Sequence, residues 1–74
     1  MSLFSRRPYL ELKTVIINLK SGSAFKGLIY KVDGGFMIIK DSALLSDRGQ
    51  HMGEKRIDGE LVLLLSEVDF VQVL

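Results

Sequence analysis

The chain contains no cysteine, no tryptophan, one proline and one histidine among its 74 residues. Without cysteine, neither disulfides nor cysteine-ligated metals can support a fold of this size. The single histidine, His51, lies in a polar stretch, and no serine, histidine and aspartate residues share the spacing of a nucleophilic site. A glycine-rich phosphate loop is also missing. The sequence therefore predicts a protein that is not an enzyme and that has no catalytic residue, no cofactor and no metal site.

Long apolar runs are missing as well. The longest run, residues 61–65, has five residues, whereas a membrane-spanning helix needs about 20. Leu3-Phe4 is too short for the apolar region of a signal peptide and is followed by Arg6-Arg7. We therefore expect a cytoplasmic protein without a membrane partner.

A chain of this length has room for one domain, covering residues 1–74. A domain this small buries only about 60% of the surface that its unfolded chain exposes, so its core alone is marginal. Yet 47% of the residues are apolar, and ten of the fourteen residues from 61 to 74 are apolar. A monomer that exposed part of this segment would be prone to associate. Contact with further copies of the chain is the expected outcome.

Residues 15–41 alternate between two faces, and glycine interrupts the alternation twice. Residues 21–23 form one tight turn, and residues 33–35 form a second, for which aspartate and glycine are suited. Gly27 lies inside the strand between these turns, where the lack of a side chain permits a sharp bend. The pattern predicts antiparallel strands over residues 10–21, 24–32, 36–45, 59–66 and 68–73.

The remaining segments are predicted to connect these strands or to precede them. Residues 1–8 form a flexible arm, and the alternation of residues 9–14 favours an extension of the first strand over a helix. Residues 46–58 are polar and contain two glycines, so we expect an exposed loop between the third and fourth strands. Ser66-Glu67 forms the turn before the last strand.

An ordered series of residues in the first half has a recognisable spacing: Val15, Leu19, Gly22, Phe25, Gly27, Ile29 and Asp33. This series resembles the first motif of the Sm/LSm superfamily, which includes bacterial Hfq. Residues 33–40 are more similar to the Hfq version, and residues 6–12 and 58–74 resemble small Sm-like proteins encoded by bacteriophages. The resemblance implies an all-β fold, a small, strongly bent five-stranded antiparallel open barrel whose N-terminal helix is absent or short.

An open barrel leaves its fourth and fifth strands with unpaired edges, and these two strands are the most apolar in the chain. Pairing the fourth strand of one copy with the fifth strand of the next satisfies both edges, and such head-to-tail contacts close into rings. We expect a homo-oligomeric ring of about five to seven copies. The predicted interface residues are Leu61, Leu63, Leu65, Val68, Phe70, Val71 and Val73.

RNA binding is the usual activity of the superfamily, so the resemblance also identifies pocket positions. Gly35 stands where a base would stack, and it has no aromatic ring. Met37 stands where an asparagine reads uracil, and it has no hydrogen-bond donor. Leu64-Leu65 replaces the basic pair of the second motif. A shift of one residue in the alignment would bring Phe36 into the stacking position, which keeps RNA binding open.

Basic charge is concentrated in residues 1–40, which have seven Lys/Arg against two acids, whereas residues 41–74 have three against seven. The asymmetry has two interpretations. Oppositely charged surfaces can contact other copies or remain solvated, or one basic face can attract nucleic-acid phosphates. The second interpretation selects basic residues and the aromatic residues near them. These candidate nucleic-acid-binding residues are Arg6, Arg7, Lys26, Tyr30, Lys31 and Phe36.

Two hypotheses for the function follow. The first is an Sm-like ring that acts as a structural or assembly module, in keeping with the bacteriophage resemblance, and whose nucleotide pocket is eroded. The alternative is an RNA-binding Sm/Hfq-like protein that acts in RNA metabolism. The steep salt dependence of phosphate contacts distinguishes weak, sequence-blind binding of single-stranded nucleic acid from base-selective binding.

Overall fold

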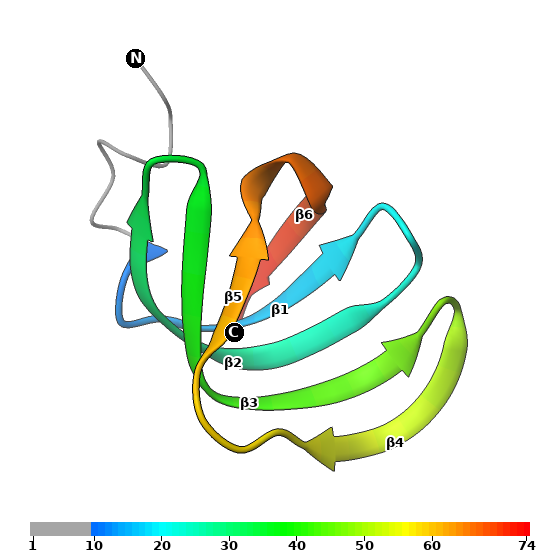
Figure 1. The fold of residues 1–74 in the computed structure, drawn as a ribbon. Helices are drawn as coiled ribbons and strands as arrows, with labels where there is room; N and C mark the ends of the chain where they lie inside the picture. Colours follow the sequence, from blue (N-terminus) through cyan, green and yellow to red (C-terminus); the bar gives the residue numbers. More distant parts are fainter. Residues whose placement is uncertain (1–9) are drawn as a thin grey trace.

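The computed structural model describes residues 10–74. They form six strands and one short 3-10 helix, arranged as a single strongly bent sheet (Figure 1). The elements are β1 (Thr14–Leu19), β2 (Ala24–Asp33), β3 (Phe36–Asp47), β4 (Gln50–Arg56), β5 (Leu61–Leu64), η2 (Leu65–Glu67) and β6 (Val68–Val73).

The strands follow the order β4-β3-β2-β1-β6, and β5 pairs with β3. All pairings are antiparallel. β4 and β5 pair with opposite ends of β3, because Ala43 lies opposite Arg56 and Phe36 lies opposite Leu64. β4 and β5 therefore lie one after the other along the same edge of the sheet, which is five strands wide. The predicted all-β, bent, open antiparallel sheet is confirmed.

The core lies on one side of this sheet, where alternate residues of neighbouring strands meet. Directly opposed residues of antiparallel strands share a face, so the pair Met37 and Leu63 and the pair Ile39 and Leu61 point to the same side. The buried apolar cluster on this side contains Val15, Ile17, Ile29, Val32, Met37, Ile39 and Leu63.

Gly27 lies at the bend of β2, as predicted. The register with β3 shifts between Lys26 and Leu28, which is the signature of a bulge. A Cβ on Gly27 would lie 2.5 Å from Cγ2 of Ile39 and 3.1 Å from the carbonyl oxygen of Lys40. Only a residue without a side chain allows β3 to approach so closely.

The predicted loop over residues 46–58 is wrong for most of its length. β3 continues to Asp47, and Gln50–Arg56 form β4. Arg48 and Gly49 both have positive φ, as in the two-residue turns of tight hairpins. All residues of β4 are exposed, so no apolar alternation marked the strand in the sequence.

The first strand also differs from the prediction, because β1 begins at Thr14 and not at residue 10. Leu12 has a φ of 63°, which a strand residue does not adopt. The segment still lies beside β2, since the amide of Leu12 donates to the carbonyl of Ile29 at 2.6 Å. Before β1, Leu10 is 3-10 helical and residues 11–12 form a turn, so the favoured extension of the first strand over residues 9–14 is not seen in the described residues. The predicted arm, residues 1–8, lies outside the described residues.

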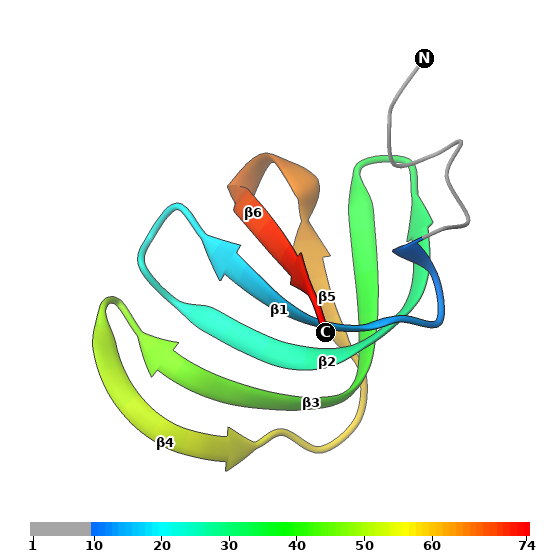
Figure 2. The same cartoon turned by 180° about the vertical axis from the view of Figure 1, so that it is seen from behind.

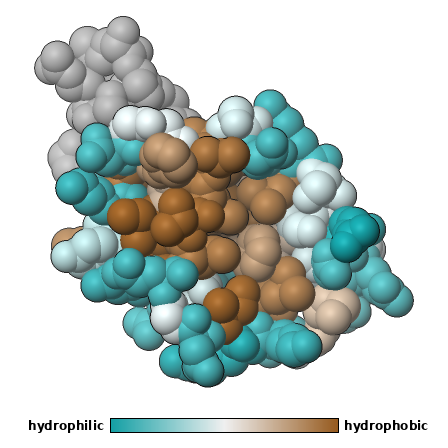
Figure 3. All heavy atoms as spheres, viewed as in Figure 1, coloured by the Kyte–Doolittle hydropathy of each residue, from teal (hydrophilic) through white to brown (hydrophobic). Residues whose placement is uncertain are grey.

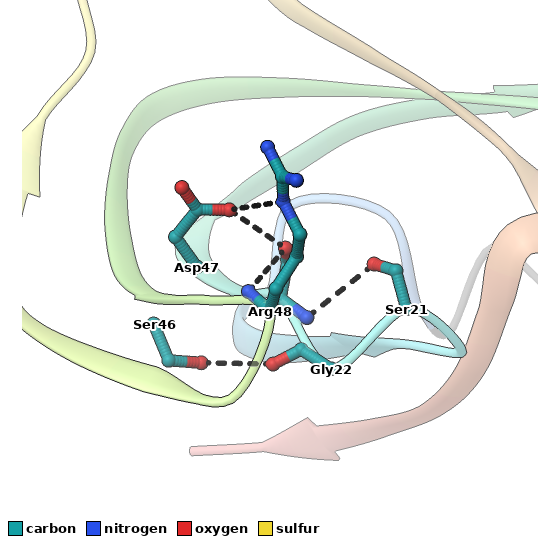
Figure 4. A network of polar contacts seen from close by, with 6 residues as sticks. Ser21, Gly22, Ser46, Asp47 and Arg48 are labelled. Atoms are coloured by element: carbon teal, nitrogen blue, oxygen red, sulfur yellow. Dashed lines mark hydrogen bonds and ion pairs between the residues drawn. The ribbon is translucent and has the colours of Figure 1, made fainter.

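Two turns are joined at one end of the sheet (Figure 4). The carbonyl of Gly22 accepts hydrogen bonds from the amide of Gly49 at 3.0 Å and from the hydroxyl of Ser46 at 3.2 Å. The hydroxyl of Ser23 accepts from the amide of Arg48 at 3.1 Å and donates to Asp47 at 3.5 Å. The turn after β1 therefore supports the tip of the β3–β4 hairpin.

Candidate assembly edges and nucleic-acid face

The two edges of the sheet have unpaired backbone. Within residues 10–74, β5 pairs only with β3, and β6 pairs only with β1. Each strand therefore has one row of amide and carbonyl groups that no other described strand satisfies. Unpaired edges of this kind are templates for pairing with another chain.

The side chains of β5 alternate between the core and the surface. Leu61 and Leu63 point to the core, whereas Val62 and Leu64 point away from it and are 55% and 48% exposed. Hydrophobic residues gather over this part of the molecule in Figure 3, around the position of β5 in Figure 1. The outward side of β5 is thus an exposed apolar surface.

β6 alternates in the same way. Val71 and Val73 lie opposite the buried residues Ile17 and Val15, so they are on the core side. Phe70 is on the other side and is 54% exposed. Both sides of β6 therefore carry apolar residues next to its free edge.

The structure corrects one predicted interface residue. Leu63 is only 8% exposed and belongs to the core, so its side chain is not available to another copy. Val62 and Leu64 are the outward residues of β5 that sequence reasoning missed. The sequence could have revealed them only through the register of residues 61–64 against residues 36–39. The other predicted interface residues lie at the partly buried or exposed positions Leu61, Leu65, Val68, Phe70, Val71 and Val73.

The turn between β2 and β3 contacts the turn before β6. The amide of Leu65 donates to the carbonyl of Gly35 at 2.8 Å. Gly35 is exposed, and a Cβ built on it would have no atom within 4 Å. Met37 is fully buried in the core. Phe36 is 48% exposed and lies opposite Leu64, so it joins the outward apolar surface of β5.

The exposed ring of Tyr30 is covered on one face. The ammonium group of Lys40 lies 3.7 Å from the centre of the ring, and Lys40 also pairs with Glu60 at 3.6 Å. The cation occupies a position where a base would stack. Stacking on this face of Tyr30 would require Lys40 to move off the ring.

The predicted basic residues on β2 have acidic neighbours. Lys26 pairs with Glu54 at 3.5 Å, and Lys31 pairs with Asp33 at 3.9 Å. Such exposed pairs are worth only about 0–1 kcal/mol each, but they reduce the local positive potential. Arg6 and Arg7 lie outside the described residues. Part of the charge asymmetry along the sequence is therefore balanced across the folded sheet, since Lys26 and Lys40 meet acids from the second half of the chain.

Among residues 10–74, no group of three or more histidine, cysteine, aspartate or glutamate residues is placed to hold a metal ion. The same residues include no helix that is long and apolar enough to cross a membrane. His51 is an exposed residue of β4.

Two solved structures of Sm proteins have a similar fold. One is a heptameric archaeal Sm protein, which is 18% identical, with a TM-score of 0.73, over 89% of this chain and 91% of the other. A second is the SmAP1 heptamer of P. aerophilum, which is 17% identical, with a TM-score of 0.78, over 100% of this chain and 95% of the other. No protein-family model and no curated protein matches the sequence. The comparison shows that the chain has the Sm fold, and the bacteriophage resemblance stays a prediction.

Proposed function

We propose that the chain is an Sm-like subunit of a closed homo-oligomeric ring and acts as a structural or assembly module. The observation that carries this proposal is the pair of free edges on β5 and β6, each flanked by exposed apolar side chains. A single bent sheet with two such edges is prone to pair further. Because the two edges differ, their contact is head-to-tail and closes into a ring when the rotation allows.

The fold neighbours support this proposal. Both solved structures described above are heptameric Sm proteins. The expected number of copies in this protein is about five to seven, a range that includes theirs. A ring also removes the exposed apolar surface that a 74-residue monomer would otherwise leave in water.

Assembly is tested by measuring the mass of the particle in solution. Light scattering across micromolar concentrations should give a single oligomer for the unmodified chain. Val62→Asp places a charge on the outward side of β5 and should dissociate the oligomer without unfolding the chain, because residue 62 is exposed. Leu12→Asp, at another exposed apolar residue outside the strands, is the matched control and should leave the oligomer intact. A monomeric unmodified chain would contradict the proposal.

For nucleic acid, we propose that the ring binds RNA without base selectivity and only at low salt. The position expected to stack a base is Gly35, and the position expected to read its edge is Met37, whose side chain is buried. Each missing base stack forgoes about 1–3 kcal/mol. We propose that the nucleotide pocket is eroded in this chain. The remaining attraction would come from exposed lysines such as Lys26 and Lys31, whose exposed ion pairs are weak.

The alternative function, base-selective RNA binding, is favoured by one observation. Phe36 is half-exposed beside the turn of residues 34–35, which is close to the position that would stack a base. Fluorescence anisotropy with oligo(U), oligo(A) and single-stranded DNA separates the two functions. We expect similar affinities for the three and a collapse of binding between low and moderate salt. Submicromolar binding of one base type that survives moderate salt and is lost in Phe36→Ala would support the alternative.

A further inference from the structure

β4 lies at the border of the sheet in Figures 1 and 2, on the same edge as β5. Within residues 10–74 it pairs only with β3, so one side of its backbone has no strand beside it. All seven of its residues are exposed. A free edge of this length is a template on which strands of other chains can add. The backbone of β4 thus determines whether the β3–β4 hairpin pairs with other chains.

β4 contains two residues more than the part of β3 with which it pairs. Leu44 lies opposite Lys55, and Ser46 lies opposite His51. Two steps along β3 therefore correspond to four steps along β4. The two additional residues lie within 52–54, and the pairing is regular on either side of them. An insertion of this kind in one strand of an antiparallel pair is a bulge.

The backbone conformation assigns the insertion to Gly53 and Glu54. Their φ angles are 68° and 55°, whereas residues of antiparallel strands have φ of about −140°. Two successive residues in the left-handed region turn their amide and carbonyl groups out of the row that a neighbouring strand would meet. An added strand could therefore not form a continuous ladder of hydrogen bonds along residues 50–56.

Charged side chains accompany the bulge. The carboxylate of Glu54 pairs with the ammonium group of Lys26 at 3.5 Å, which ties the bulge to β2 across the sheet. Lys55 and Arg56 follow and are exposed, so the second half of β4 has three consecutive charged residues. Bulges and charges are two features by which natural proteins protect their free edges. β5 has neither, because its register with β3 is unbroken and its four residues are apolar.

We propose that the bulge of Gly53 and Glu54 closes the edge of β4 to strand addition and so prevents the β3–β4 hairpin from pairing with other chains. This device is separate from the proposed ring contact, because it acts on β4 and not on β5 or β6. In a ring, every copy contributes one β4 edge. Open β4 edges would therefore link rings to one another and produce larger particles.

Deleting Gly53 and Glu54 together tests the proposal. The loss of two residues removes the insertion and keeps every remaining residue of β4 on its side of the sheet, because the side-chain period of a strand is two. Light scattering at one micromolar concentration should give the deletion variant at least twice the mass of the unmodified chain, and this mass should rise with concentration. Circular dichroism should show the same sheet content in both proteins.

Glu54→Gly is the matched control. It removes the charge and the ion pair with Lys26 but keeps the bulge, since glycine readily adopts a positive φ. The control should have the mass of the unmodified chain. A folded deletion variant whose mass is unchanged overturns the proposal. A control with the larger mass also overturns it, because the charge and not the bulge would then close the edge.

Hydrogen exchange of the unmodified chain provides a second measurement, which decides the matter if the deletion variant does not fold. Amides of residues 50–56 should exchange at the same rate at every protein concentration, because no other chain covers the edge of β4. Exchange in these residues that slows at least tenfold as the concentration rises overturns the proposal. A monomeric unmodified chain would contradict the proposed ring but not this inference, since the deletion should still raise the mass.

Discussion

Gly27→Ala should destabilise the fold, because the added methyl group has no room at the bend of β2. The new Cβ would lie 2.5 Å from Cγ2 of Ile39, 3.1 Å from the carbonyl oxygen of Lys40 and 3.2 Å from Cα of Ser42. Two of these three neighbours are backbone atoms, which cannot move aside as a side chain can. Overpacking a well-filled core costs about 1–3 kcal/mol, whereas the reduced entropy of the unfolded chain returns only about 0.4–1 kcal/mol. The net expected loss is about 1–2 kcal/mol, or about 5–15 °C in melting temperature for a domain of this size.

A second substitution tests the cause of this loss. Ile39→Leu removes the Cγ2 methyl group at nearly constant volume and should alone cost less than about 1.5 kcal/mol. Combined with Gly27→Ala, it should recover part of the loss, because it removes the closest contact and leaves the two backbone contacts. Denaturant unfolding of the four proteins at one fixed protein concentration measures this coupling. A Gly27→Ala protein as stable as the unmodified chain, or losses that are simply additive, would refute the explanation by close approach.

Three further substitutions test local features by the same unfolding measurement. Ser42→Ala should be neutral or stabilise by about 1 kcal/mol, because the fully buried Ser42 hydroxyl has no hydrogen-bond partner among residues 10–74. A loss above that amount would reveal a partner. Leu12→Asn should stabilise by up to about 1 kcal/mol, because Leu12 is 70% exposed and has a φ of 63°, a conformation that asparagine tolerates better. A clear loss would show that the leucine contacts another copy. Gly22→Ala should lower the free energy of unfolding more than Gly34→Ala. Both glycines have positive φ, but only a Cβ at residue 22 would meet backbone, 3.0 Å from the amide nitrogen of Gly49. Equal losses of stability would argue against close packing of the two turns.

The sequence predicted the parts of the fold that carry an alternating apolar pattern. β2 and β6 match the predicted ranges to within one residue, and Gly27 was assigned to the bend that it occupies. Where the pattern was missing, the prediction failed. β4 is exposed at every residue and follows a turn of Arg48-Gly49, whose first residue is not a usual turn former.

The candidate site was predicted less completely, because it depends on register. The apolar run of residues 61–65 contains no polar residue that would show which side faces the core. Only the pairing of β5 with β3 reveals that Leu63 is buried and that Val62 and Leu64 point outward. Similarly, no sequence pattern could show that Lys40 lies over the ring of Tyr30, since Tyr30 lies at a shift in the register between β2 and β3. The pairing of strand edges across copies is a property of the whole sheet and not of any segment.

Native mass spectrometry of the unmodified chain tests the central claim most directly. If the edges of β5 and β6 pair head-to-tail, the spectrum should contain one closed species whose mass is an integer multiple of 8.3 kDa, with about five to seven copies. Val62→Asp should shift this species to the single-chain mass, while Leu12→Asp should not. An unmodified chain that appears only at 8.3 kDa, across micromolar concentrations and at physiological salt, would contradict the ring.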